Sequence, residues 1–190
     1  MTKPTFAVRP GAVALMALMA ATRFHHFGTP FALPDASLAV FFFAGLWLGG
    51  RYLFALLLAE AGLIDYLAIT KLGVSDFCFS NAYAFLAVSY GAMWLGGKWC
   101  RQSDTLTLVN STQRLAAMTT ATSVAFLISN GSFYWLSGRP SDTSWEQYAD
   151  SFAAYFPSYL GMTLAYGVAI FSLTTIISAM LGSKSRQQAV

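Results

Sequence analysis

Charged side chains are scarce in this 190-residue chain. Asp, Glu, Lys and Arg make up 10% of the residues, whereas a soluble domain carries about a quarter. Hydrophobic residues make up 56%, and the mean hydropathy is +0.55. Too few polar residues remain to cover a separate soluble domain. We therefore expect one integral membrane domain over residues 1–190.

Cysteine and the common catalytic motifs are equally sparse. The sequence holds two cysteines, Cys78 and Cys100, which make neither a CxxC relay nor a disulfide framework. It contains no phosphate-binding loop, dinucleotide fingerprint or HExxH pattern, so we do not expect the chain itself to hydrolyse nucleotide. It also lacks a basic patch interleaved with aromatics, which argues against nucleic acid as a partner.

What the chain does have is apolar runs, and about 20 apolar residues can cross the hydrocarbon as a helix. The turn sequence Gly49-Gly50-Arg51 divides one overlong run into two. The predicted fold is an all-α membrane protein with six transmembrane helices. The predicted spans are residues 11–27, 36–48, 52–70, 81–95, 115–136 and 152–181. Residues 137–151 are predicted to form a polar outer loop long enough to cap a pocket.

The basic residues predict the orientation, because cytoplasmic loops collect Lys and Arg. With the N-terminus inside, eight of the 11 basic residues are cytoplasmic and three, Arg23, Lys71 and Arg139, are outside. This predicts a protein with both termini on the cytoplasmic side. A competing interpretation makes the first apolar segment a signal peptide, because Lys3 and Arg9 precede a short apolar core. No A-x-A site follows that core at the usual place.

Cys78 is the main candidate for chemistry. It lies in the polar break at residues 71–80, on the same predicted side of the membrane as His25 and His26. A thiolate is a soft ligand that suits cobalt, Cu(I), zinc or iron. Alternatively, Cys78 packs as an inert small hydrophobe, which is also how we interpret Cys100.

The two histidines are adjacent, so on a helix their side chains point about 100° apart and only one can face a given ligand. With only these two in the sequence, a haem held by two imidazoles on facing helices is not expected. Two acids, Glu60 and Asp65, fall in the third predicted span, where an ionisable residue is a functional candidate by default. We expect Asp65, nearer the outer end, to face the mouth.

Three further features complete the candidate set. Tyr83 follows Cys78 by slightly more than one helical turn, and Arg139 in the outer loop either holds an acidic or amide-rich ligand or is solvated. Small residues form an Ala17-x-x-x-Ala21 ridge and a Gly45-x-x-x-Gly49 ridge. Such ridges let helices approach closely in lipid.

The sequence resembles a known family of membrane proteins. Six predicted spans in about 190 residues and the ridge on span 1 look like a substrate-binding S-component of an energy-coupling-factor (ECF) vitamin transporter. The segments Thr22-Arg23-Phe24-His25-His26-Phe27-Gly28-Thr29-Pro30, Leu33-Pro34-Asp35-Ala36-Ser37 and Asp76-Phe77-Cys78-Phe79 are similar to the BtuM family of solitary cobalamin-specific S-components. The resemblance covers essentially the whole chain.

The resemblance implies a site for cobalamin (vitamin B12). It assigns Cys78 as the axial ligand of the cobalt, and His26, Asp65 and Tyr83 as residues that line the corrin pocket. It also implies that Ala17 and Ala21 face the transmembrane subunit of a shared coupling module, whose ATPases supply the energy.

The residues fit that chemistry independently. Phe77 and Phe79 can pack on the apolar flanks of the macrocycle, and Asp65, Tyr83 and Arg139 can pair with its peripheral amides, because buried amides need partners. Thiolate ligation would labilise the opposite axial ligand, so loss of cyanide from cyanocobalamin is a side reaction to test.

Two other functions remain open from the sequence. One is a membrane transpeptidase of the exosortase type, using Cys78 as nucleophile with Arg139 and His25 or His26. The aromatic neighbours of Cys78 favour a roomy cavity over a compact nucleophile–base pair. The other is an assembly subunit without a ligand, in which Cys78 is inert.

Overall fold

The computed structural model describes residues 10–24, 33–77, 79–101, 108–140 and 143–187 of the chain. Within these residues the fold is all-helical, as predicted, and contains no strand. It contains six α-helices, of which α2 is extended by a π-helical turn (η1) and α4 is preceded by a 3₁₀ turn (η2). In chain order the elements are α1 (Pro10–Thr22), α2 (Ser37–Phe43), η1 (Ala44–Leu48), α3 (Arg51–Leu72), η2 (Asn81–Ala84), α4 (Phe85–Cys100), α5 (Leu108–Leu136) and α6 (Trp145–Gln187).

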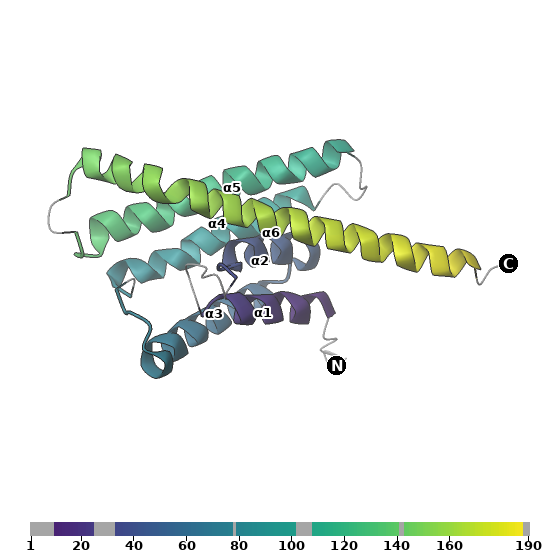
Figure 1. Ribbon diagram of the computed structural model, residues 1–190, viewed down its shortest axis with the longest axis horizontal. Coiled ribbons are helices and arrows are strands. Elements are labelled where there is room, and N and C mark those ends of the chain that lie inside the picture. The colour runs from purple at the N-terminus through teal and green to yellow at the C-terminus, as the bar shows by residue number, and fades with distance from the viewer. Residues whose placement is uncertain (1–9, 25–32, 78, 102–107, 141–142, 188–190) are drawn as a thin grey trace, which may run out of the picture.

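Successive helices run in opposite directions along the bundle (Figure 1). The α3–α4 connection and the α5–α6 connection therefore lie at one end of the molecule. The start of α1 and the end of α6 lie at the other end (Figure 1). We call the first of these the connection end, and it is where the candidate site is found.

Helix α2 forms the centre of the bundle. It contacts α1, α3, α4 and α6, and the side chains from Ala39 to Phe43 are fully buried. The ring of Phe41 stacks on Tyr90 of α4 with centroids 4.3 Å apart, and Phe43 packs edge-on against Phe171 of α6. A helix that is apolar on every face is excluded from water, and here neighbouring helices cover it.

The glycine ridge predicted at Gly45 is a close helix contact. A Cβ at Gly45 would overlap the backbone oxygen of Trp94, and a Cβ at Gly97 would overlap the backbone oxygen of Phe42. The backbones of η1 and α4 thus touch without intervening side chains, as small residues permit. Gly49 ends η1 with a φ of 60°, a left-handed conformation that glycine adopts without steric cost, so the predicted turn before Arg51 is present.

Several helices differ in extent from the predicted spans: α1 ends at Thr22, α4 extends to Cys100, and α5 and α6 begin earlier than the spans predicted for them. Helix α5 begins at Leu108 rather than near residue 115. Helix α6 begins at Trp145, so half of the predicted outer loop is helical. The cause is Ser144, whose hydroxyl accepts the N–H of Gln147 and whose carbonyl accepts that of Tyr148. A serine cap with an acid in the first turn, here Glu146, is a helix start signal.

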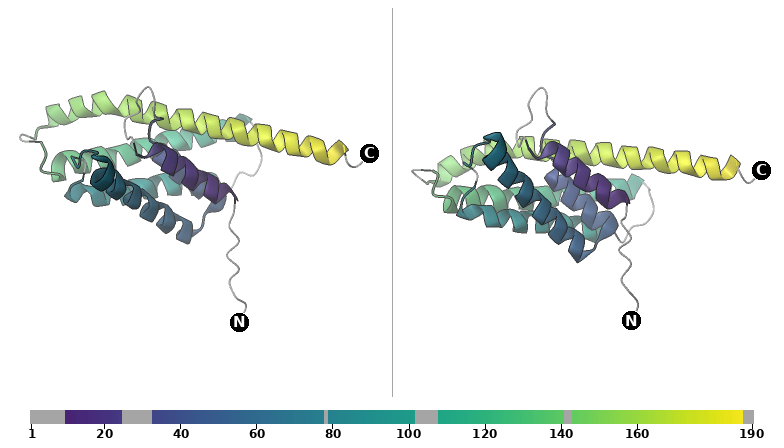
Figure 2. Two further views of the ribbon diagram at one scale, coloured as in Figure 1. Left: turned by 60° about the horizontal axis from the view of Figure 1, so that its bottom comes forward. Right: turned by 90° about the horizontal axis from the view of Figure 1, so that it is seen from below.

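Two helices in the described part of the chain, Tyr52–Leu72 and Trp145–Met180, are long and apolar enough to cross a membrane, and each contains an 18-residue stretch with a mean hydropathy of 1.8. The segments Pro10–Thr22 and Ser37–Leu48 are shorter apolar helices. Figures 1 and 2 show that α6 extends past the ends of the other helices at its C-terminal end.

Candidate ligand-binding site

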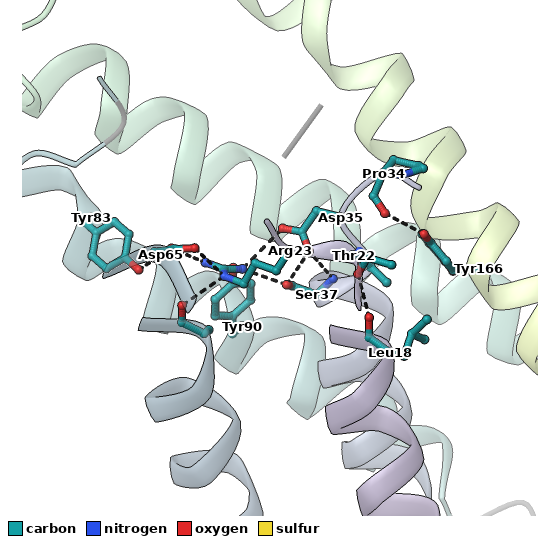
Figure 3. Close-up of polar contacts among 12 residues, drawn as sticks. Leu18, Thr22, Arg23, Pro34, Asp35, Ser37, Asp65, Tyr83, Tyr90 and Tyr166 are labelled. Atoms are coloured by element: carbon teal, nitrogen blue, oxygen red, sulfur yellow. Dashed lines mark hydrogen bonds and ion pairs between the residues drawn. The ribbon is translucent and has the colours of Figure 1, made fainter. Parts of the chain in front are cut away.

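A buried arginine organises the connection end of the bundle. Arg23, in the turn after α1, is 1% exposed. Its Nε and Nη2 donate to the two carboxylate oxygens of Asp65 at 2.8 and 2.7 Å. Its Nη1 donates to the hydroxyls of Ser37 (2.8 Å) and Tyr90 (2.6 Å) and lies 3.4 Å from Asp35 (Figure 3). A bidentate guanidinium–carboxylate pair is the strongest arrangement these groups can form.

The network joins four separate segments of the chain. Arg23 also donates to the backbone oxygen of Ala61 in α3 (3.2 Å). Asp35 accepts the backbone N–H of Ser37 at the start of α2. Tyr83 of η2 donates its hydroxyl to Asp65 at 2.6 Å (Figure 3). Charged hydrogen bonds therefore fix four parts of the chain to one another: the turn after α1, the start of α2, the C-terminal half of α3, and η2 with α4.

An inner cavity of about 150 Å³ adjoins this network. Its walls include Arg23, Asp35, Asp65 and the hydroxyl side chains of Ser37, Ser89, Ser129 and Thr163. A cavity with several polar groups can hold water or a polar part of a ligand.

An outer cavity of about 330 Å³ lies beside the inner one, and Tyr83, Leu86, Ser129 and Tyr159 border both. Its wall is mostly aromatic, with a few polar side chains. The remaining lining residues are Phe77, Ala82, Phe126, Asn130, Phe133, Ser151 and Tyr155. An apolar wall with a few polar groups is the usual composition of a small-molecule site.

The segment before α4 is held at the mouth of the outer cavity by ring contacts. Phe77 packs on Phe133 of α5, with centroids 5.5 Å apart, and the guanidinium of Arg139 lies 5.4 Å from the centroid of the Phe77 ring. Arg139 also donates to the backbone oxygen of Asp76. Phe79 packs on Tyr83 at 4.6 Å, while Ser80 begins η2 by accepting the N–H of Ala82. Phe77 and Phe79 nevertheless remain about half exposed.

The structure brings together five residues that the sequence nominated: Asp65, Tyr83, Phe77, Phe79 and Arg139. Asp65 lies deeper than a residue at the mouth, in the wall of the inner cavity. It is 4% exposed and both of its oxygens accept hydrogen bonds from Arg23. The reason is that a carboxylate inside a helical bundle is stable only when it is paired.

The other predictions have mixed outcomes. Cys78, His25 and His26 lie outside the described residues. Ala17 and Ala21 are exposed on α1, whereas Cys100 is buried. Glu60 is half-buried, and its Oε2 has no hydrogen-bond partner among the described residues.

Sequence reasoning missed the residues that complete the site, above all Arg23 and Tyr90. Arg23 was counted only as an outer positive charge. Its position within an apolar run was a usable signal, because an ionisable residue inside a span is a functional candidate by default. Tyr90, Phe126 and Tyr159 gave no such signal, because aromatic residues are common throughout this chain.

The described residues contain no group of three or more His, Cys, Asp or Glu side chains placed to hold a metal ion. A scan against protein-family models finds no match, and a search of curated proteins finds none either.

Proposed function

We propose that this chain is a membrane-embedded cobalamin-binding subunit of a vitamin uptake system, of the S-component type. It captures the corrin at the outer face of the bacterial cytoplasmic membrane and moves it inward. A shared ECF coupling module provides the ATPases, because the sequence has no nucleotide-binding motif.

One observation carries the proposal. Of the residues that the sequence nominates for the corrin site, Asp65 and Tyr83 line the inner cavity and Phe77 and Tyr83 line the outer one, while Phe79 and Arg139 contact two of these lining residues. They come from four separate places in the chain, namely α3, the segment before α4, η2 and the α5–α6 connection. The contacts are the Tyr83–Asp65 hydrogen bond, the Phe79–Tyr83 ring contact and the Arg139–Phe77 contact.

The outer cavity suits one edge of a corrin. Its volume of about 330 Å³ is at the low end of the roughly 300–1,000 Å³ typical of ligand sites. The rest of the macrocycle would lie over the half-exposed rings of Phe77 and Phe79. The peripheral amides would find hydroxyl partners such as Ser129 and Ser151 in the wall, because buried amides need hydrogen bonds.

In this proposal Cys78 is an axial ligand of the cobalt. Its sequence neighbour Phe77 lines the outer cavity, which supports the assignment. One protein ligand is sufficient, since the corrin itself holds the metal. A thiol that binds a metal ion gives up its proton at neutral pH. His26 is the second residue that the proposal assigns to the pocket.

The membrane arrangement is part of the proposal. The six helices cross the bilayer, with the connection end outside and both termini inside, as the distribution of basic residues indicates. The alternating helix directions are compatible with this arrangement. Ala17 and Ala21, exposed on α1, form the surface that meets the coupling subunit.

Equilibrium binding of cyanocobalamin to the detergent-purified protein tests the function. We expect about one corrin per chain, and Phe77→Ser to weaken binding roughly tenfold through loss of aromatic contact. Phe85→Ser, which changes an exposed ring on α4 that borders neither cavity, serves as the control. Failure of the wild type to retain corrin would contradict the proposal and would favour the transpeptidase function instead. Equal affinity of both variants would move the site away from the outer cavity.

A further inference from the structure

Asp65 is already occupied by protein donors. Arg23 takes both of its oxygens, and Tyr83 donates a third hydrogen bond to Oδ2. Its side chain is 5% exposed. Three of the roughly four acceptor positions of this carboxylate are therefore taken by protein donors, and two of these bonds come from a charged guanidinium. Asp65 therefore acts on the site through the residues it holds.

We propose that Arg23 is a positioning residue of the ligand site, and that it acts through Asp65 on the ring of Tyr83. This inference rests on the function proposed above and deepens it. It assigns the buried charge network to preorganisation of the cavity wall, with no direct contact between Arg23 and the corrin.

The hydrogen bonds account for each step from Arg23 through Asp65 to Tyr83, which we call the relay. Arg23 is fixed on its far side by Ser37, Tyr90 and the carbonyl of Ala61, so its guanidinium has one orientation. That orientation sets the plane of the Asp65 carboxylate by two parallel hydrogen bonds. The carboxylate then fixes the hydroxyl of Tyr83.

Tyr83 is the residue through which the Arg23–Asp65 pair affects ligand binding. Its ring borders both cavities and packs against Phe79 at the mouth. Without the bond to Asp65 the phenol is free to rotate into either cavity. A wall already held in the bound conformation increases affinity, because less ordering is left to occur on binding.

A double-mutant cycle on cyanocobalamin affinity tests the relay. Tyr83→Phe keeps the ring and removes only the hydroxyl bond to Asp65. Arg23→Lys keeps the positive charge but cannot make the bidentate pair, so the network remains charge-balanced and the protein is expected to fold. Tyr166→Phe is the matched control, because it removes a 2.6 Å tyrosine bond to the carbonyl of Pro34 that borders neither cavity.

We expect Tyr83→Phe and Arg23→Lys each to weaken cyanocobalamin binding roughly tenfold. The double variant should also lose roughly tenfold, because residues that act through one relay are not additive. Tyr166→Phe should lower the melting temperature of the ligand-free protein about as much as Tyr83→Phe while its affinity stays within about twofold of the wild type.

Three results would overturn the inference. A loss of roughly a hundredfold in the double variant would show that the two residues act independently. Wild-type affinity in Tyr83→Phe would show that the hydroxyl bond does not position the wall, and the proposed function would stand without the relay. No binding by the wild type would remove the function itself and the relay with it.

Discussion

Among single residues, the ion pair between Arg23 and Asp65 has the largest expected effect on stability. Both side chains are nearly inaccessible to solvent, so removal of the carboxylate charge leaves a buried cation with less compensation. We predict that Asp65→Asn lowers the free energy of unfolding by about 3 kcal/mol. Denaturant or thermal unfolding in a fixed detergent measures this loss.

Asp35→Asn is the matched comparison for that prediction. Asp35 is more exposed, and its contact with Arg23 is longer, at 3.4 Å. Asparagine can still accept the N–H of Ser37, because Asn and Asp are both favoured at helix starts. We expect a loss of about 1 kcal/mol or less. Equal losses in the two variants would contradict the central position of the Arg23–Asp65 pair.

For single residues, the sequence predicted which residues lie at the site better than it predicted what each of them contacts. Asp65 and Tyr83 stand out because polar and ionisable residues are rare in apolar runs. Their partner Arg23 is 42 residues away from Asp65 in the chain, and no local pattern links such distant positions. The pairing of Asp65 with Arg23 could not be predicted, because it depends on tertiary contacts that one sequence does not display.

Among the elements, the contact between α2–η1 and α4 is the least tolerant of change. A side chain at Gly97 would overlap the backbone of Phe42, and backbone cannot move aside as a flexible side chain can. We predict that Gly97→Ala costs about 1–3 kcal/mol or more in unfolding free energy, by overpacking. The same unfolding assay measures it.

Gly91→Ala on the same helix provides the opposite expectation. A Cβ at Gly91 meets nothing within 4 Å, and alanine favours a helix over glycine by up to about 1 kcal/mol. Gly91→Ala should therefore be neutral or stabilising. A destabilised Gly91→Ala, or an undisturbed Gly97→Ala, would show that the two helices do not pack with this register.

The elements themselves were largely predictable, because apolar runs and the Gly49-Gly50 turn are local signals. The start of α5 was misplaced because its first turns are polar, with Asn110, Ser111 and Thr112. Hydropathy locates the apolar part of a helix and does not locate its first residue. The start of α6 was misplaced for the same reason. There the cap at Ser144 was the better guide.

For the whole molecule, the length of α6 is the feature that most constrains a membrane arrangement. The part of α6 from Trp145 to Met180 has 36 residues, which is about 54 Å at 1.5 Å per residue. The hydrocarbon core is about 30 Å thick. In the proposed arrangement we expect α6 to be strongly tilted or to extend past the inner surface of the bilayer.

The central claim is that this molecule binds cobalamin with Cys78 on the cobalt. The most direct measurement is the visible absorption spectrum of the detergent-purified protein mixed with cobalamin, with wild type beside Cys78→Ala. A thiolate on the cobalt changes its ligand field, so we predict stoichiometric corrin with shifted bands in the wild type and unshifted bands in the variant. Corrin retained with identical spectra would remove Cys78 from the site, and no retained corrin in either protein would contradict the claim as a whole.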